Sequence, residues 1–121
     1  MTEEIQPVEK ASRDVPKRLQ PYYLGLLRKG PRWNETEGGD ATALLPQHLA
    51  FLRQEIERGR YVVAGPVTDG GDVVGMMILN VANAEEAQQV ANEDPGVKAG
   101  RLRVEILPVL LPALDGIRVS Y

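Results

Sequence analysis

The chain has 121 residues, with no cysteine and a single histidine. Without cysteine there is neither a disulfide framework nor a thiolate nucleophile. One imidazole and no thiol also argue against a zinc site, because such sites draw several ligands from these side chains. We therefore expect a protein that works without a metal ion or another cofactor.

The chain also lacks an excess of basic residues and any long apolar run. Its formal net charge is −3, whereas a surface that binds nucleic acid needs clustered positive charge, so we expect no nucleic-acid partner. No apolar stretch approaches the about 20 residues that span a bilayer. The first residues do not include the apolar segment of a secretory signal. These absences predict a cytoplasmic protein without membrane contact.

Three segments of the chain differ in composition. Residues 1–20 mix both charges with few aliphatic side chains, so we expect a flexible N-terminal arm. Residues 21–108 carry regular apolar patterns and turn residues, and their length suits one folded domain. Residues 109–121 begin with apolar side chains. We expect this C-terminal tail to pack on the domain or on a dimer partner.

The patterns within residues 21–108 predict the order β-α-β-β-α-β. Apolar and β-branched stretches indicate strands at residues 22–28, 61–64, 73–79 and 102–106, and amphipathic stretches between them indicate two helices. This order is typical of the ferredoxin-like α+β fold. We therefore expect a four-stranded antiparallel sheet with two helices on one face.

Several residues predict where the helices and the last strand begin or end. Pro46 suits the first position of the first helix, and Gly59 suits the position just after its end. Asn83 with Glu86 three residues later forms a capping-box pattern at the start of the second helix. Pro108 is expected to end the last strand.

The predicted topology brings unusual residues to one edge of the sheet. The loop after the first strand carries Arg28, Arg32 and Trp33. The start of the first helix carries His48, the second strand ends at Gly65-Pro66, and Asp94 follows the second helix. Because alternate elements run in opposite directions, all four places lie at the same edge.

Four short motifs carry a resemblance to a known family. They are Pro46-Gln47-His48, Gly65-Pro66, Asp94-Pro95 and Lys98-Ala99-Gly100, in this order over about residues 22–108. The chain resembles the YciI-like (YCII-related domain) family. This resemblance implies a dimeric α+β barrel in which two sheets pack face to face. It also implies an active-site pair made of His48 and Asp94, and a lyase- or isomerase-like activity.

The pair His48 and Asp94 is the candidate catalytic centre. A carboxylate beside an imidazole fixes its tautomer, so the other ring nitrogen can act as a general base or acid. The alternative interpretation is that His48 is a half-exposed helix residue and Asp94 merely starts a turn before a proline. Residue types alone favour this alternative, while the topology and the resemblance favour the pair.

Arg28, Arg32, Trp33, Gly65 and Pro66 are the candidate substrate-binding residues. The arginines could hold a carboxylate or a phosphate, because a guanidinium suits bidentate contact with planar anions. The alternative interpretation is a solvated loop, since clusters of charge on loops are common.

Two functions follow from these residues. The first is a small cofactor-independent enzyme that uses His48 and Asp94 for isomerisation, elimination or dehalogenation of a small, anionic or aromatic molecule. The second is a noncatalytic module that binds a small-molecule ligand. In either case a homodimer is expected, because helices on one face leave the other face of the sheet uncovered.

Overall fold

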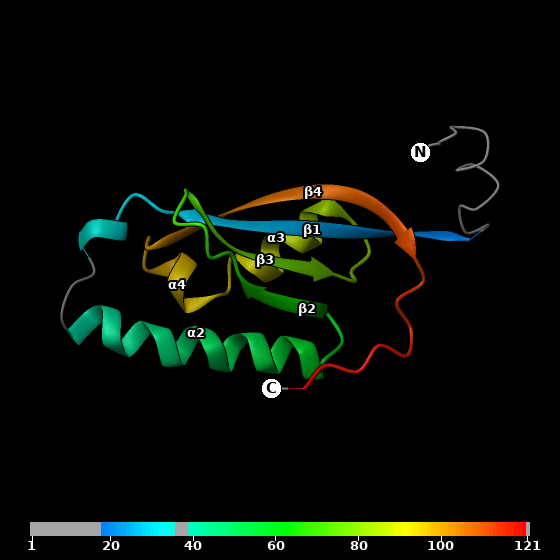
Figure 1. The fold of residues 1–121 in the computed structure, drawn as a ribbon, viewed down its shortest axis with the longest axis horizontal. Coiled ribbons are helices and arrows are strands. Elements are labelled where there is room, and N and C mark those ends of the chain that lie inside the picture. The colour runs from blue at the N-terminus through cyan, green and yellow to red at the C-terminus, as the bar shows by residue number, and fades with distance from the viewer. Residues whose placement is uncertain (1–17, 36–38, 121) are drawn as a thin grey trace.

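The computed structural model describes residues 18–35 and 39–120. Its elements in chain order are β1 (Leu19–Lys29), the short helix η1 (Trp33–Glu35), α2 (Gly39–Glu57), β2 (Tyr61–Pro66), β3 (Val73–Leu79), α3 (Ala84–Ala91), α4 (Pro95–Lys98) and β4 (Leu102–Pro112) (Figure 1). The predicted β-α-β-β-α-β order is present. The two short helices η1 and α4 are additions to it.

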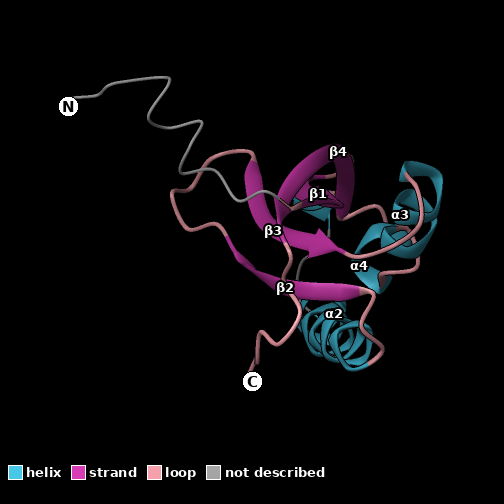
Figure 2. Ribbon diagram, turned by 90° about the vertical axis from the view of Figure 1, so that its right-hand side faces the viewer, coloured by secondary structure: helices cyan, strands magenta, loops and turns pink. Residues whose placement is uncertain are grey.

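The four strands form one sheet in the order β2-β3-β1-β4, and every neighbouring pair is antiparallel. This is the strand order of the ferredoxin-like fold. Figure 2 shows the helices gathered on one side of the curved sheet. The predicted fold class is confirmed.

Within residues 18–35 and 39–120, none of the helices is long and apolar enough to span a membrane.

The hydrophobic core lies between the sheet and the helices. Leu27, Met77 and Leu79 point from the central strands toward this side, and α3 contributes Ala87, Val90 and Ala91. Gly25 pairs with Met77 across the two central strands. A Cβ atom at Gly25 would lie 2.6 Å from the Met77 Cε atom, so the glycine makes room for this core side chain.

The end of α2 follows the sequence prediction. Gly59 has a φ of 79°, which L side chains rarely adopt. Its N–H donates to Ile56 O at 3.0 Å, and Arg60 N–H donates to Glu55 O at 3.1 Å. These two bonds make the Schellman motif that ends a helix at a glycine and returns the chain into a strand.

The start of α3 also has its predicted cap. Glu86 N–H donates to the Asn83 side chain at 2.8 Å. The Glu86 carboxylate accepts from the Ala82 N–H at 3.0 Å, one residue earlier than in the usual capping box.

Two predicted boundaries are wrong, and both involve proline. Helix α2 begins at Gly39, so Pro46 lies inside it and His48 is not near its start. Proline lacks an N–H for the helix, but a helix can continue through it when tertiary packing holds the helix in place, and α2 packs against α4 and β2. Strand β4 continues through Pro108 to Pro112. It is an edge strand, where a missing N–H can face away from the sheet.

Residues at both ends of the described chain extend the sheet beyond the predicted strands. Residues 1–17 of the predicted arm lie outside the described residues, whereas Leu19 and Gln20 pair with the end of β4. After β4, Leu114 N–H donates to the Tyr22 hydroxyl at 2.8 Å. Tyr22 is only 1% exposed, and part of its cover therefore comes from the C-terminal segment.

Candidate active site

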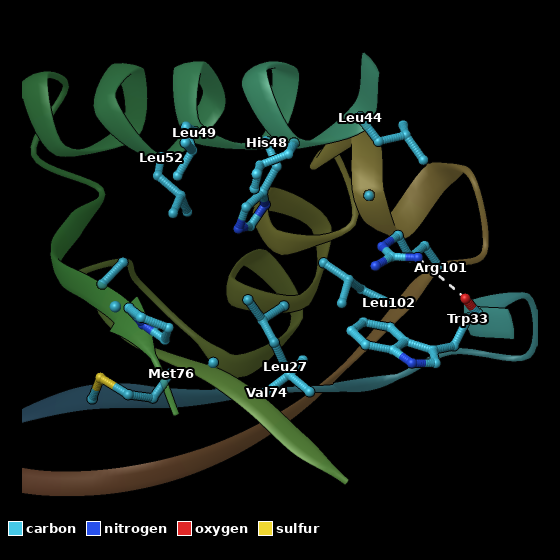
Figure 3. Close-up of a pocket in the computed structure, with 16 residues that line it drawn as sticks. Leu27, Trp33, Leu44, His48, Leu49, Leu52, Val74, Met76, Arg101 and Leu102 are labelled. Carbon is cyan, nitrogen blue, oxygen red and sulfur yellow. Dashed lines mark hydrogen bonds between the residues drawn. The ribbon is translucent and has the colours of Figure 1, made fainter. Parts of the chain in front are cut away.

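A cavity of about 400 Å³ opens between α2, the ends of β2 and β3, and the α4–β4 turn (Figure 3). This volume falls in the range of about 300 to 1,000 Å³ usual for small-molecule sites. Most of the wall is apolar. The lining residues are Leu27, Trp33, Leu44, Leu45, His48, Leu49, Leu52, Ala64, Gly65, Pro66, Val74, Gly75, Met76, Gly96, Arg101 and Leu102.

His48 and Asp94 meet at the wall of this cavity. The Nδ1 atom of His48 lies 2.6 Å from the Oδ2 atom of Asp94, and their side chains are 17% and 2% exposed. A carboxylate only accepts hydrogen bonds, so a neutral imidazole in this contact carries its proton on Nδ1. The Nε2 atom is then a proton acceptor at a residue that lines the cavity.

The Asp94 carboxylate is held by the backbone of α4. Its Oδ1 atom accepts from the Gly96 N–H at 2.8 Å, which makes Asp94 the N-cap of this helix. Pro95 occupies the first helical position, where its missing N–H costs no hydrogen bond. The sequence Asp-Pro-Gly thus fixes one oxygen locally and leaves the other directed at His48.

Tyr61 lies buried close to this pair. It is 1% exposed, its ring lies nearly perpendicular to that of Phe51 with the centroids 5.9 Å apart, and its hydroxyl has no hydrogen-bond partner among the residues that the structure describes. Burial, aided by the negative charges of Asp94 and Glu55, raises the pKa of the Tyr61 phenol. The phenol therefore stays neutral wherever the protein is folded at ordinary pH.

Arg101 is a site residue that the sequence interpretation missed. Its guanidinium carbon lies 4.1 Å from the centre of the Trp33 ring, and its Nη1 donates to Trp33 O at 3.1 Å. Lys29 approaches the same ring with its Nζ at 5.5 Å. Arg101 directly follows the Lys98-Ala99-Gly100 motif, so its position in the sequence could have marked it as a candidate site residue.

The predicted substrate-binding residues separate into two groups. Trp33, Gly65 and Pro66 line the cavity, whereas Arg28 and Arg32 are not among its described lining residues. Arg28 lies on the opposite face of the sheet, because the preceding residue of the strand faces the cavity and side chains alternate. There its guanidinium contacts Asp72 at 3.0 Å and Glu105 at 2.9 Å, and these hydrogen bonds raise the pKa of Arg28.

The described residues contain no group of three or more His, Asp or Glu side chains placed to hold a metal ion. The functional groups that the wall does offer are an imidazole backed by a carboxylate and a guanidinium stacked on an indole. The first can accept and return a proton. The second can bind a negative charge.

The family model of the YCII-related domain matches residues 31–110, which is most of the chain. The chain belongs to the YCII-related domain family. Among solved structures it is similar to the 5-chloro-2-hydroxyhydroquinone dehydrochlorinase of Burkholderia phenoliruptrix AC1100, in complex with 2,5-dihydroxybenzoquinone, with a TM-score of 0.52 and 20% identity. This likeness covers 71% of our chain and 90% of the other. It supports the fold. No curated protein sequence matches the chain.

Proposed function

We propose that this YCII-related protein is a cofactor-independent enzyme that moves a proton on a small organic molecule. His48 is the general base and acid, and Asp94 orients it. The observation that carries the proposal is the 2.6 Å contact between their side chains at the wall of an apolar cavity. A buried carboxylate partner fixes the tautomer and orientation of an imidazole, and the apolar wall keeps bulk water away from the reacting atoms.

In the proposed reaction Nε2 of His48 removes a proton from the bound molecule. In an elimination, the electron pair of the broken bond forms a new π bond while a leaving group such as chloride departs with its own pair, and the imidazolium releases its proton to water. In an isomerisation no group leaves: the electron pair delocalises over a neighbouring double bond, and the imidazolium returns the proton to another atom of the molecule. One catalytic pair can therefore serve both reactions.

The structural neighbour supplies a starting substrate for testing. Its name describes the loss of hydrogen chloride from a chlorinated hydroxyhydroquinone. The test is chloride release by our protein from a panel of chlorinated hydroquinones that includes this compound. We expect measurable turnover in the wild type.

The decisive variant is His48→Asn. The asparagine amide nitrogen can replace Nδ1 as a donor to Asp94, so the buried contact survives while the Nε2 base is lost. We expect turnover to fall by about 10²- to 10⁴-fold, the usual contribution of general acid–base catalysis. Binding of panel compounds without turnover in the wild type would instead indicate the noncatalytic ligand-binding module.

We also propose that the protein is a homodimer formed through the uncovered face of the sheet. Leu24 pairs with Ile78 and Leu26 with Met76, on the face opposite the core. Leu107, beside Leu24 on β4, is 38% exposed. Light scattering should give twice the chain mass of 13.3 kDa, and Leu26→Glu should give the monomer. A monomeric wild type would contradict the dimer and leave the chemistry of His48 untouched.

A further inference from the structure

We propose that the cavity selects organic anions, and that Arg101, stacked on Trp33, binds the negatively charged oxygen. The apolar body of the ligand packs against the leucines of α2. This inference rests on the proposed function, because it names the substrate class of the same site. It makes Arg101 the residue that determines specificity and leaves the proton transfer to His48.

The charge of the wall supports this class of ligand. The whole chain has a net charge of −3, yet no acidic residue is among the lining residues that the structure describes. Arg101 is the permanently charged side chain among them. Beside leucine side chains, a hydrogen bond from a guanidinium to a negative ligand atom is stronger than the same bond in water.

The position of Arg101 is fixed before any ligand binds. Its backbone N–H donates to Gly96 O at 3.1 Å, and its carbonyl accepts from Gly30 N–H at 2.7 Å. Its side chain is clamped to Trp33 by the ring contact of 4.1 Å and the 3.1 Å hydrogen bond to the carbonyl. A donor that is already ordered loses little conformational entropy on binding, which favours affinity.

The arrangement of the side chains also predicts how the ligand lies. Figure 3 shows Arg101 and Trp33 at one end of the cavity, Leu49 and Leu52 toward the other, and His48 between them. An anion held at Arg101 thus extends its apolar body past the imidazole toward these leucines. The proton that His48 removes belongs to the middle of the molecule, within a few bonds of the charged oxygen.

The test compares binding of an acid with binding of its neutral amide. Trp33 is the single tryptophan of the chain and lies beside Arg101, so its fluorescence reports on occupancy of the cavity. Cyclohexanecarboxylate and cyclohexanecarboxamide have the same shape and do not absorb at the excitation wavelength of tryptophan. We expect the acid to bind about 10- to 100-fold more tightly, the usual gain from a charged hydrogen bond.

The variants assign this preference to one side chain. Arg101→Met keeps the apolar stem and should remove the preference, whereas Arg101→Lys should keep only part of it because an ammonium lacks the planar fork. Arg103→Met is the matched control, since Arg103 lies two residues further along and contacts Asp72 at 3.4 Å outside the cavity lining. It should keep the full preference.

The outcome is independent of whether the protein is catalytic. His48→Asn should still prefer the acid, so loss of turnover and loss of anion selectivity are separate results. Equal binding of acid and amide by the wild type would overturn the proposal. The same holds if neither compound changes the Trp33 fluorescence, or if Arg101→Met, checked for its fold by circular dichroism, keeps the preference.

Discussion

Two carboxylates are fully buried in the described part of this molecule, and their partners differ. Asp94 is 1% exposed and contacts the imidazole of His48. Glu55 is 0% exposed and contacts Arg60 through both oxygens, at 2.5 and 2.8 Å. The Asp94 contact joins α2 to the start of α4, whereas the Glu55 contact joins the end of α2 to the turn before β2.

The difference lies in what the partner can do with a proton. The hydrogen bond to Glu55 raises the pKa of Arg60, so this guanidinium stays charged and the contact is a permanent ion pair. The imidazole of His48 contacts Asp94 through Nδ1 and keeps Nε2 for accepting and returning a proton. The same buried carboxylate thus gives structural support beside arginine and chemical reactivity beside histidine. The cavity lies on the histidine side, because His48 lines it and neither Glu55 nor Arg60 is among its described lining residues.

The largest expected effect comes from changing each carboxylate to its amide. Asp94→Asn should lower turnover by about 10²- to 10⁴-fold, because an amide no longer fixes the imidazole with its proton on Nδ1. Glu55→Gln should leave turnover close to the wild type at temperatures where it is folded. Nitrogen-15 NMR of the single histidine checks the cause, since Asp94→Asn should shift its tautomers toward Nε2–H. Equal losses of turnover in both variants would contradict the comparison.

The next effect concerns the ion pair. Arg60→Met leaves the Glu55 carboxylate buried without its main partner and should lower the free energy of unfolding by about 3 to 5 kcal/mol. The double variant Glu55→Leu/Arg60→Met should regain most of this loss, because two apolar side chains need no solvation. Urea denaturation measures both variants. If the double variant were as unstable as Arg60→Met, the ion pair would stabilise the fold by more than the removal of two unpaired charges explains.

A smaller effect should come from Tyr61, which lies within the field of both carboxylates. Its hydroxyl is buried and has no hydrogen-bond partner in the described part of the chain, so Tyr61→Phe should raise the free energy of unfolding by about 1 kcal/mol. The variant should also be less sensitive to alkali. The raised pKa of the folded phenol makes unfolding easier above about pH 10, where only the unfolded chain loses the proton.

Denaturation of wild type and Tyr61→Phe from pH 7 to 11 gives this comparison directly. The free energy of unfolding should fall above about pH 10 by up to about 1.4 kcal/mol per pH unit more in the wild type than in the variant. The other tyrosines are common to both proteins and cancel in the difference. Parallel curves would show that the phenol titrates alike in the folded and unfolded chains.

The smallest effect is expected at Arg58. Its Nη1 atom lies 3.6 Å from the Glu55 Oε2 atom, but its side chain is 55% exposed. Exposed ion pairs contribute little, so Arg58→Ala should change the free energy of unfolding by less than about 0.5 kcal/mol. A loss comparable to that of Arg60→Met would show that Glu55 depends on both arginines.

Local sequence patterns predicted the order of elements because each pattern acts over a few residues. Val73–Leu79 has the predicted bounds of the third strand, and Gly59 and Asn83 end and begin helices as expected. The meeting of His48 and Asp94 was also predicted, from chain directions that bring their segments to the same edge of the sheet. The predicted start of the helix was wrong, however, because α2 begins at Gly39 and carries His48 in its interior.

Tertiary structure decided what the local patterns left open. Pro46 and Pro108 suggested boundaries, but packing of α2 over the cavity and pairing of an edge strand carry both elements through them. Tertiary structure also decided which cation lines the cavity. Arg28 and Arg101 both lie next to loops at this edge of the sheet. Arg28 is on the strand face that points away from the cavity, whereas stacking on Trp33 holds Arg101 at the cavity wall. The sequence by itself determined the elements and their directions, which depend on near neighbours. The side of the sheet that each charge reaches depends on contacts between distant segments.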